Sequence, residues 1–181
     1  MKNLCNGSLD SSWTLNLMSA SSKIDSYELL LTQMEALLVS NWVSNLANAS
    51  ALLWEHFHTQ QKPQSEVNWA GFYTYNSSKQ ILELGPFQGK IACQIIEIGK
   101  GVCGTSVQKK QTQLIVDVHE FPGHIACDAA SNSEIVVPIL SENQEVLGVI
   151  DIDCKEINGF DQVDQKYLER LASLLASKFE N

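Results

Sequence analysis

The sequence predicts an α+β fold in which an antiparallel sheet is flanked by helices. Between residues 25 and about 60, apolar side chains recur every three or four positions, which is the period of an amphipathic helix. From residue 67 to 154 the period changes to two, and polar turn residues separate short apolar segments. The helical period returns near Asp161 and continues towards the end of the chain. Two helices, a meander of strands and a last helix are the order typical of an α+β layer fold.

Length, composition and charge indicate one globular domain and exclude several classes of partner. A chain of 181 residues closes one sizeable core. Its net charge of -9, with no basic run, argues against a nucleic-acid partner. Its apolar stretches fall well short of the roughly 20 residues that span a bilayer, so no membrane association is expected.

The five cysteines are an odd number in a chain too large to need disulfide bonds for stability. The N-terminus carries one cation, Lys2, and lacks the apolar run of a secretory signal. We therefore expect a reducing, cytoplasmic location in which any disulfide is transient.

The N-terminal part divides into a tail and two helices. Residues 1–24 are rich in serine and asparagine without periodicity, which predicts a mobile tail followed by a domain over residues 25–181. Asp25 and Glu28 resemble a capping box at the start of the first helix. Asn41 is the expected cap of the second helix, which "QKPQSE" ends. The apolar face of the first helix comprises Tyr27, Leu30, Leu31, Met34, Leu37 and Leu38, and that of the second Trp42, Leu46, Ala49, Leu53 and Phe57.

The alternating part of the chain predicts six strands, a short helix and one long loop. The strands are expected over residues 67–75, 80–88, 90–98, 112–118, 134–140 and 146–153. "VCGTSVQKK" is at most a short helix, and "SENQE" turns between the last two strands. About fifteen residues, 119–133, carry no periodicity, and a loop of this length in a compact domain is usually a binding or catalytic segment. The loop contains Cys127.

Three glycines around Cys103 match the spacing of a dinucleotide-binding loop, but their context does not. Gly99, Gly101 and Gly104 follow a strand. The next strand, however, belongs to an antiparallel meander, and no acidic residue ends a second parallel strand about 20 positions on. The glycines instead place Cys103 in the first turn of a short helix, where amide donors and the helix dipole favour a thiolate.

A metal site is not expected from the cysteine spacing. His124 and Cys127 have an H-x-x-C spacing, but Cys93 and Cys103 are ten positions apart and no C-x-x-C pair exists. Cys154, at the end of a strand, fits a buried core residue. The remaining thiols of the folded domain lie next to glycines and loops, which favours redox chemistry.

Acidic and aromatic side chains on neighbouring strands predict a pocket. Asp151 and Asp153 alternate with isoleucines and therefore share one face of their strand. Glu134 opens the adjoining strand and can join them. Trp69 and Tyr73 likewise share a face. With helices covering the sheet, such acids must meet a cation or one another, so the set suggests a pocket for a small cation with an oxidisable or reducible end.

The motifs "NWAGFY", "LGPFQGKIACQ", "GKGVCGT", "PGHIACD", "SEIVVPI" and "GVIDIDC" occur in this order along the chain. Together they resemble the GAF-domain free methionine-(R)-sulfoxide reductases, over residues 25 to 181. The set is specific, because GAF domains that bind cyclic nucleotides or chromophores lack this cysteine triple. The resemblance implies a GAF fold, with an antiparallel sheet flanked by helices and a ligand enclosed on one sheet face by loops.

The resemblance also implies the site and its chemistry. The redox cysteines are Cys93, Cys103 and Cys127. The substrate residues comprise Trp69 and Tyr73 around the methyl sulfoxide and the carboxylates of Glu134, Asp151 and Asp153. The family uses no metal and no organic cofactor, and similar proteins are often homodimers. Cys5 and Cys154 lie outside the triple.

The implied reaction is reduction of free methionine-(R)-sulfoxide by a cysteine thiolate, assisted by a carboxylic acid. A sulfenic acid forms and a neighbouring thiol converts it to a disulfide, which thioredoxin reduces. Cys127, in the long loop, is the favoured nucleophile with Cys93 and Cys103 resolving, and the reverse order with Cys103 attacking stays open. The alternative function is a non-catalytic GAF sensor that binds a small ligand.

Overall fold

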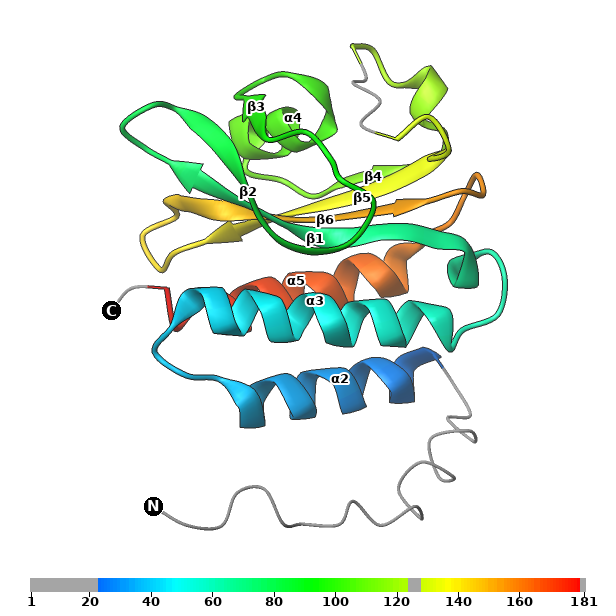
Figure 1. The fold of residues 1–181 in the computed structure, drawn as a ribbon, viewed down its shortest axis with the longest axis horizontal. Coiled ribbons are helices and arrows are strands. Elements are labelled where there is room, and N and C mark those ends of the chain that lie inside the picture. Colours follow the sequence, from blue (N-terminus) through cyan, green and yellow to red (C-terminus); the bar gives the residue numbers. More distant parts are fainter. Residues whose placement is uncertain (1–22, 124–127, 180–181) are drawn as a thin grey trace.

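The structure, a computed structural model, describes residues 23–123 and 128–179 and shows one six-stranded sheet between helices (Figure 1). The strands are β1 Val67–Asn76, β2 Ile81–Gly89, β3 Ile95–Glu97, β4 Gln113–Ile115, β5 Ser133–Leu140 and β6 Val146–Cys154. The helices are α2 Lys23–Leu37, α3 Trp42–His58, α4 Gly101–Lys109 and α5 Gln162–Ala176, with short 3-10 turns η1 Gln64–Glu66 and η2 Val118–Glu120. The sheet order is β3-β2-β1-β6-β5-β4, and each neighbouring pair is antiparallel. The predicted α+β class is confirmed.

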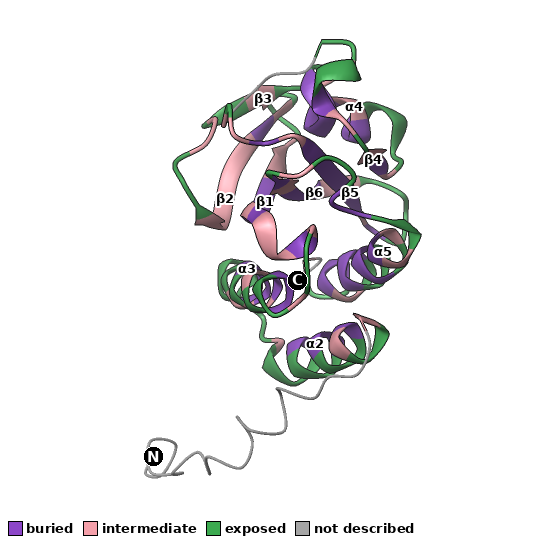
Figure 2. Ribbon diagram, turned by 90° about the vertical axis from the view of Figure 1, so that its right-hand side faces the viewer, coloured by how far each residue is buried: buried purple, intermediate pink, exposed green. Residues whose placement is uncertain are grey.

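The helices cover both faces of the sheet. Helices α3 and α5 lie against one face with α2 beneath them, whereas α4 lies over the other face (Figures 1 and 2). Side chains buried between the sheet and α2, α3 and α5 form the larger core, which includes Phe57, Phe72 and Ile150. A second cluster, under α4, includes Trp69 and Tyr73. Because α4 covers this second face, which we call the α4 face, the polar side chains on it are withdrawn from water.

The first helix begins earlier than its expected cap. Helix α2 starts at Lys23, so Lys23 and Ile24 are helical, whereas both were expected in the tail. Residues 1–22, including Cys5, lie outside the described residues. The predicted capping box is wrong, because Asp25 lies inside the helix and Glu28 accepts hydrogen bonds from Tyr167 (2.8 Å) and Arg170 (2.6 Å). Glu28 therefore joins α2 to α5.

The cap predicted for the second helix is confirmed, because Asn41 caps α3 through a hydrogen bond from the amide of Ser44. The last helix begins where it was expected, and Asp161 is its N-cap. Trp42 was expected in the core, but it is 40% exposed and stacks on Phe179. Of the helices that the structure describes, none combines the length and the apolar character that a bilayer crossing requires.

Two strands are shorter than predicted. Within the expected strand 90–98, only Ile95–Glu97 pairs with β2, and within 112–118 only Gln113–Ile115 pairs with β5. The backbone of Lys90 is used differently, because its carbonyl accepts a hydrogen bond from the indole of Trp69 (3.1 Å). Residues 90–94 thus form a segment beside the α4 face instead of continuing the sheet edge.

Cys154 is a core residue, as predicted. It is fully buried in the larger core, and its thiol donates a hydrogen bond to the carbonyl of Pro63 (3.3 Å). This position separates Cys154 from the α4 face.

A buried carboxylate on α5 joins this helix to α2, which lies beneath it. Asp164, in the first turn of α5, accepts hydrogen bonds from Tyr27 (2.8 Å) and from Gln64 (3.0 Å), and it forms an ion pair with Lys23 (2.6 Å). It also accepts the amide of Asp161 and so completes a capping box. One side chain therefore satisfies donors from three parts of the chain.

We expect Asp164→Ala to lower the free energy of unfolding by about 3 kcal/mol, because it leaves the buried Tyr27 hydroxyl without an acceptor and removes a buried ion pair. Urea denaturation followed by circular dichroism measures the change. Glu35→Ala on the exposed side of α2 is the matched control, with an expected effect within about 0.5 kcal/mol. Equal effects of the two substitutions would contradict the assigned role of Asp164.

Candidate active site

The register of three central strands brings the predicted acids and aromatics together on the α4 face. Asp153 of β6 lies opposite Trp69 of β1 on one side and opposite Glu134 of β5 on the other. Asp151, two residues earlier, lies opposite Gly71. Since residues two apart in a strand share a face, these side chains form two adjacent rows across the sheet. The predicted grouping of the acids with Trp69 and Tyr73 on one face is therefore confirmed.

Glycines let helix α4 approach this face closely. A Cβ atom at Gly104 would collide with the backbone carbonyl of Glu97, and Gly101 has a φ of +59°, which is unfavourable for residues with a side chain. The glycine spacing therefore serves packing of α4 against β3. The antiparallel sheet confirms that it is not a dinucleotide-binding loop.

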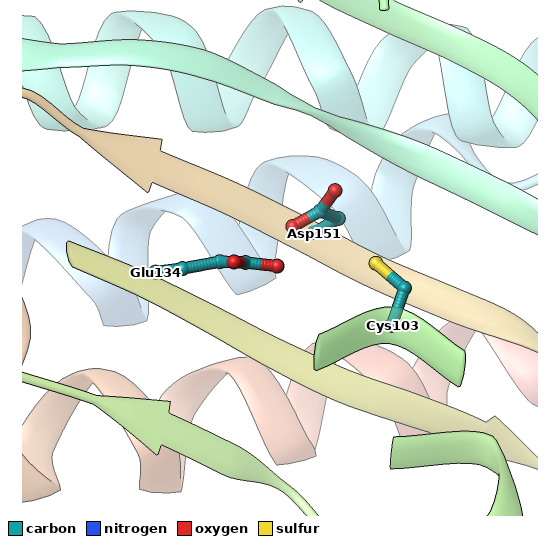
Figure 3. Close-up of side chains that lie close together, drawn as sticks. All are labelled: Cys103, Glu134 and Asp151. Atoms are coloured by element: carbon teal, nitrogen blue, oxygen red, sulfur yellow. The ribbon is translucent and has the colours of Figure 1, made fainter. Parts of the chain in front are cut away.

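Helix α4 places Cys103 over the acids. Figure 3 shows the side chains of Cys103, Glu134 and Asp151 pointing towards one another from α4, β5 and β6. The thiol sulfur and one oxygen of each carboxyl group lie within 4.8 Å of one another, which is a spacing that can also hold a metal ion. The exposed fractions of these residues are 4%, 6% and 7%.

Burial dominates the electrostatics of the three acids. Burial raises the pKa of Asp151 to about 6, although hydrogen bonds with Cys103 and Glu134 act in the opposite direction. Burial, and then the charges of Asp151 and Asp153, raise the pKa of Glu134 well above its ordinary value. Burial and the charge of Asp151 also raise the pKa of Asp153. Burial and mutual repulsion thus both favour the protonated forms of these acids.

Cys103 is a free thiol and not the activated thiolate that its helix position predicted. Burial, followed by the charges of Asp151 and Glu134 and a hydrogen bond to Asp151, raises its pKa well above the ordinary value. The dipole of a nine-residue helix is outweighed, because a thiolate here would be desolvated next to carboxylates.

Asp151 has unused hydrogen-bonding capacity. Its Oδ1 atom is buried and has no hydrogen-bond partner among the described residues. A buried carboxylate oxygen without a donor costs free energy, so natural structures rarely leave one unless a ligand supplies the donor. Asp151 therefore points to a ligand with positively charged or hydrogen-bonding groups.

Stacked aromatic rings lie in the buried cluster under α4, but they are not among the residues that line the pocket around Cys103. Trp69 stacks on Tyr73 at 5.8 Å and on Phe87 at 5.3 Å between ring centroids. Gly71, between Trp69 and Tyr73 in sequence, leaves the space that these rings occupy, because a Cβ atom there would lie 2.8 Å from the Trp69 ring. Burial and the charges of Asp151 and Cys103 raise the pKa of Tyr73, so it stays a neutral phenol.

Several pocket residues were not found by sequence reasoning. The pocket that contains Cys103, Glu134, Asp151 and Asp153 is also lined by Ile96, Lys100, Gly101, Val102, Asp128 and Ser131. Ser131 forms a hydrogen bond with Asp153, and Asp128 accepts from Asn68 and pairs with Lys90 (3.3 Å). Asp128 could have been suspected because it follows Cys127 in the long loop, whereas Ser131 gave no sequence signal.

The remaining predicted cysteines are only partly described. Cys93 is disulfide-bonded, and neither Cys103 nor Cys154 is its partner, since both are free thiols. Cys127 and His124 lie outside the described residues. The structure thus places Cys103 in the pocket and shows Cys93 in an oxidised state.

Comparisons with known proteins agree on a family. A model described as "GAF domain" matches residues 58–180. The chain is 51% identical to the free methionine-R-sulfoxide reductase of Saccharomyces cerevisiae, over 89% of both chains. It is 49% identical to the Escherichia coli protein of the same name, over 75% of this chain and 76% of that one.

A solved structure supports the same assignment. The free methionine-R-sulfoxide reductase of Neisseria meningitidis, solved in complex with its substrate, superimposes with a TM-score of 0.82 at 41% identity. The match covers 90% of this chain and 93% of that one. With the GAF model and the yeast relative, this likeness covers most of the chain. The chain belongs to the GAF-domain family of free methionine-R-sulfoxide reductases.

Proposed function

We propose that this protein reduces free methionine-(R)-sulfoxide to methionine. The observation that carries the proposal is the buried pair Glu134 and Asp151 with the half-buried Asp153, next to the Trp69 and Tyr73 rings. One Asp151 oxygen has no donor among the described residues. The family relatives bear this activity in their names, and the Neisseria protein was solved with its substrate.

The acids suit the α-ammonium group of a free amino acid. An ammonium group carries three donors and one positive charge, and Asp151 Oδ1 offers a buried acceptor. Burial and then mutual repulsion raise the pKa of Glu134 and of Asp153, and a cation bound to these carboxylates offsets both effects. A peptide-bound methionine has no such cation, so these contacts select the free amino acid.

The opposite end of the pocket suits the α-carboxylate group. Helix α4 begins at Gly101, and its N-cap residue, Lys100, makes no side-chain hydrogen bond to the first turn. Lys100, Gly101 and Val102 all line the pocket. Backbone amides at a helix N-terminus and a neighbouring ammonium group bind carboxylates well. The pocket thus has complementary charge for both ends of an amino acid.

The aromatic rings suit the methyl sulfoxide group. Trp69 and Tyr73 are almost fully buried and offer a neutral, apolar surface to the methyl group. Glu134, whose pKa is raised, is the acid that we assign as the proton donor to the sulfoxide oxygen, which makes the sulfur electrophilic.

The chemical step needs a thiolate and one proton. We propose that the thiolate of Cys127 attacks the sulfoxide sulfur while an acid protonates the oxygen, which yields methionine and a sulfenic acid on Cys127. The thiol of Cys93 then displaces water from the sulfenic acid to form a disulfide. The disulfide-bonded state of Cys93 and the raised pKa of Cys103 favour Cys93 over Cys103 as the resolving thiol.

The cycle closes when an external dithiol reduces the disulfide. Thioredoxin is the reductant that we propose, because a dithiol transfers two electrons through a mixed disulfide and leaves both protein thiols reduced. A cytoplasmic, reducing environment suits the free thiols of Cys103 and Cys154. Assembly as a homodimer is part of the same proposal.

Thiol titration tests the function and separates it from the alternative of a non-catalytic sensor. When free methionine-(R)-sulfoxide is added to the reduced protein without thioredoxin, we expect about two thiols to be lost for each methionine formed. Cys127→Ser should lose none and release no methionine, whereas Cys5→Ser and Cys154→Ser should match the unaltered protein. Ligand binding without thiol loss would indicate a sensor, and methionine release by Cys127→Ser would show that another thiol attacks first.

The preference for free over N-acetylated substrate tests whether the acids bind the ammonium group. An N-acetyl group removes the positive charge and leaves desolvated carboxylates unpaired, a loss on the order of 2–5 kcal/mol. We expect kcat/KM for free methionine-(R)-sulfoxide to exceed that for its N-acetyl form by about a hundredfold or more.

Substitution of Asp151 checks the cause of this selectivity. Asp151→Asn should raise KM for the free amino acid and narrow the gap between the two substrates. Glu145→Gln, an exposed acid at the turn before β6, is the matched control and should leave both kcat/KM values unchanged. Equal kcat/KM values for the two substrates in the unaltered protein would show that the acids do not bind the substrate's ammonium group.

A further inference from the structure

We propose that the reduced protein binds a zinc ion in the substrate pocket through Cys103, Glu134 and Asp151. The three side chains come from α4, β5 and β6 and point towards one another (Figure 3). Their donor atoms lie within 4.8 Å of one another. Asp151 Oδ1, buried in a residue that is only 7% exposed, has no partner among the described residues and is available as a ligand.

The dimensions of the cluster fit a zinc ion. Zinc bonds of about 2.3 Å to sulfur and about 2.1 Å to oxygen hold tetrahedral ligands roughly 3.5 Å apart. Donor atoms already within 4.8 Å need only small side-chain rotations to reach this spacing. Both acids sit on central strands, which fixes their backbones. The cluster therefore needs little rearrangement to close on an ion.

The ligand types favour zinc over the commoner divalent ions. Magnesium and calcium require five or more oxygen ligands, whereas a thiolate with two carboxylates is a mixed, softer set. Three protein ligands leave the fourth position to water, which is the pattern of an open and exchangeable site and not of a structural one.

The charge of the pocket favours a divalent cation. Glu134 and Asp151 belong to the cluster, and Asp153 lines the same pocket. Among the described residues that line this pocket, Lys100 is the one cation. Binding of zinc ionises the thiol of Cys103 and pairs the buried carboxylates with positive charge. The proton of the thiol is released to solvent.

A zinc ion at this position would affect catalysis, an effect that rests on the proposed function. The zinc ion and the substrate ammonium group would use the same carboxylates and therefore exclude each other. Zinc would then act as a reversible inhibitor that competes with methionine sulfoxide and protects Cys103 from oxidation.

Cobalt titration tests the site without turnover. Reduced protein is titrated with Co²⁺, whose thiolate complexes absorb in the near ultraviolet, and Zn²⁺ is then added to displace it. We expect about one Co²⁺ per chain, loss of the thiolate band in Cys103→Ser, and at least about tenfold weaker binding in Glu134→Gln or Asp151→Asn. Cys154→Ser, which alters a thiol buried in the core on the opposite face of the sheet, should bind as the unaltered protein does.

The other redox thiols provide the decisive control. A protein carrying both Cys93→Ser and Cys127→Ser should keep the thiolate band. A band that survives Cys103→Ser and disappears in this double variant would overturn the proposal, as would the lack of any band in the unaltered protein. Thermal unfolding confirms that each variant is folded. If Co²⁺ binds through Cys103 but saturating methionine does not weaken its binding, the metal site stands and the proposed ammonium site falls.

Discussion

The withdrawal of three carboxyl groups from water is the constraint on which the rest of the site depends. Glu134, Asp151 and Asp153 lie on adjacent central strands, and α4 covers the face to which they point. In water such carboxyl groups would be ionised and solvated, and they would repel one another only weakly. Under α4 their pKa values are raised and the thiol of Cys103 is kept protonated, and one Asp151 oxygen has no donor within residues 23–123 and 128–179. The fold thus stores unfavourable electrostatic free energy that a cationic ligand relieves.

The remainder of the architecture makes this arrangement possible. Antiparallel register aligns Trp69, Asp153 and Glu134 in one row, and Gly104 allows α4 to pack closely against the end of β3. The larger core under the other face, with its buried Asp164 network, fixes the sheet independently of the site. The larger core therefore supplies stability that offsets the unfavourable burial of the acids, and it takes no part in the chemistry.

The sequence predicted the alternating elements well and the irregular ones poorly. Alternation around Asp151 and Asp153 placed both side chains on one face, because a strand has only two faces. The cap Asn41 was predictable from local hydrogen bonding, and the start of the last helix near Asp161 from the return of the helical period. The segment 90–94 was not, since its apolar residues suggested a strand while the indole of Trp69 captures the Lys90 carbonyl. The position of Cys103 in the first turn of a helix suggested an activated thiolate. Burial, together with the charges of Asp151 and Glu134 from distant parts of the sequence, instead raises the pKa of its thiol.

Proton release on ligand binding tests the central claim most directly. If the buried acids hold protons that an ammonium group displaces, then methionine binding to the reduced protein near pH 6, the pKa of Asp151, should release protons. Calorimetry in two buffers of different ionisation enthalpy measures this number. The account predicts net release with methionine, less release with Asp151→Asn, and none with N-acetylmethionine. Methionine binding without proton release, or with proton uptake, would contradict it.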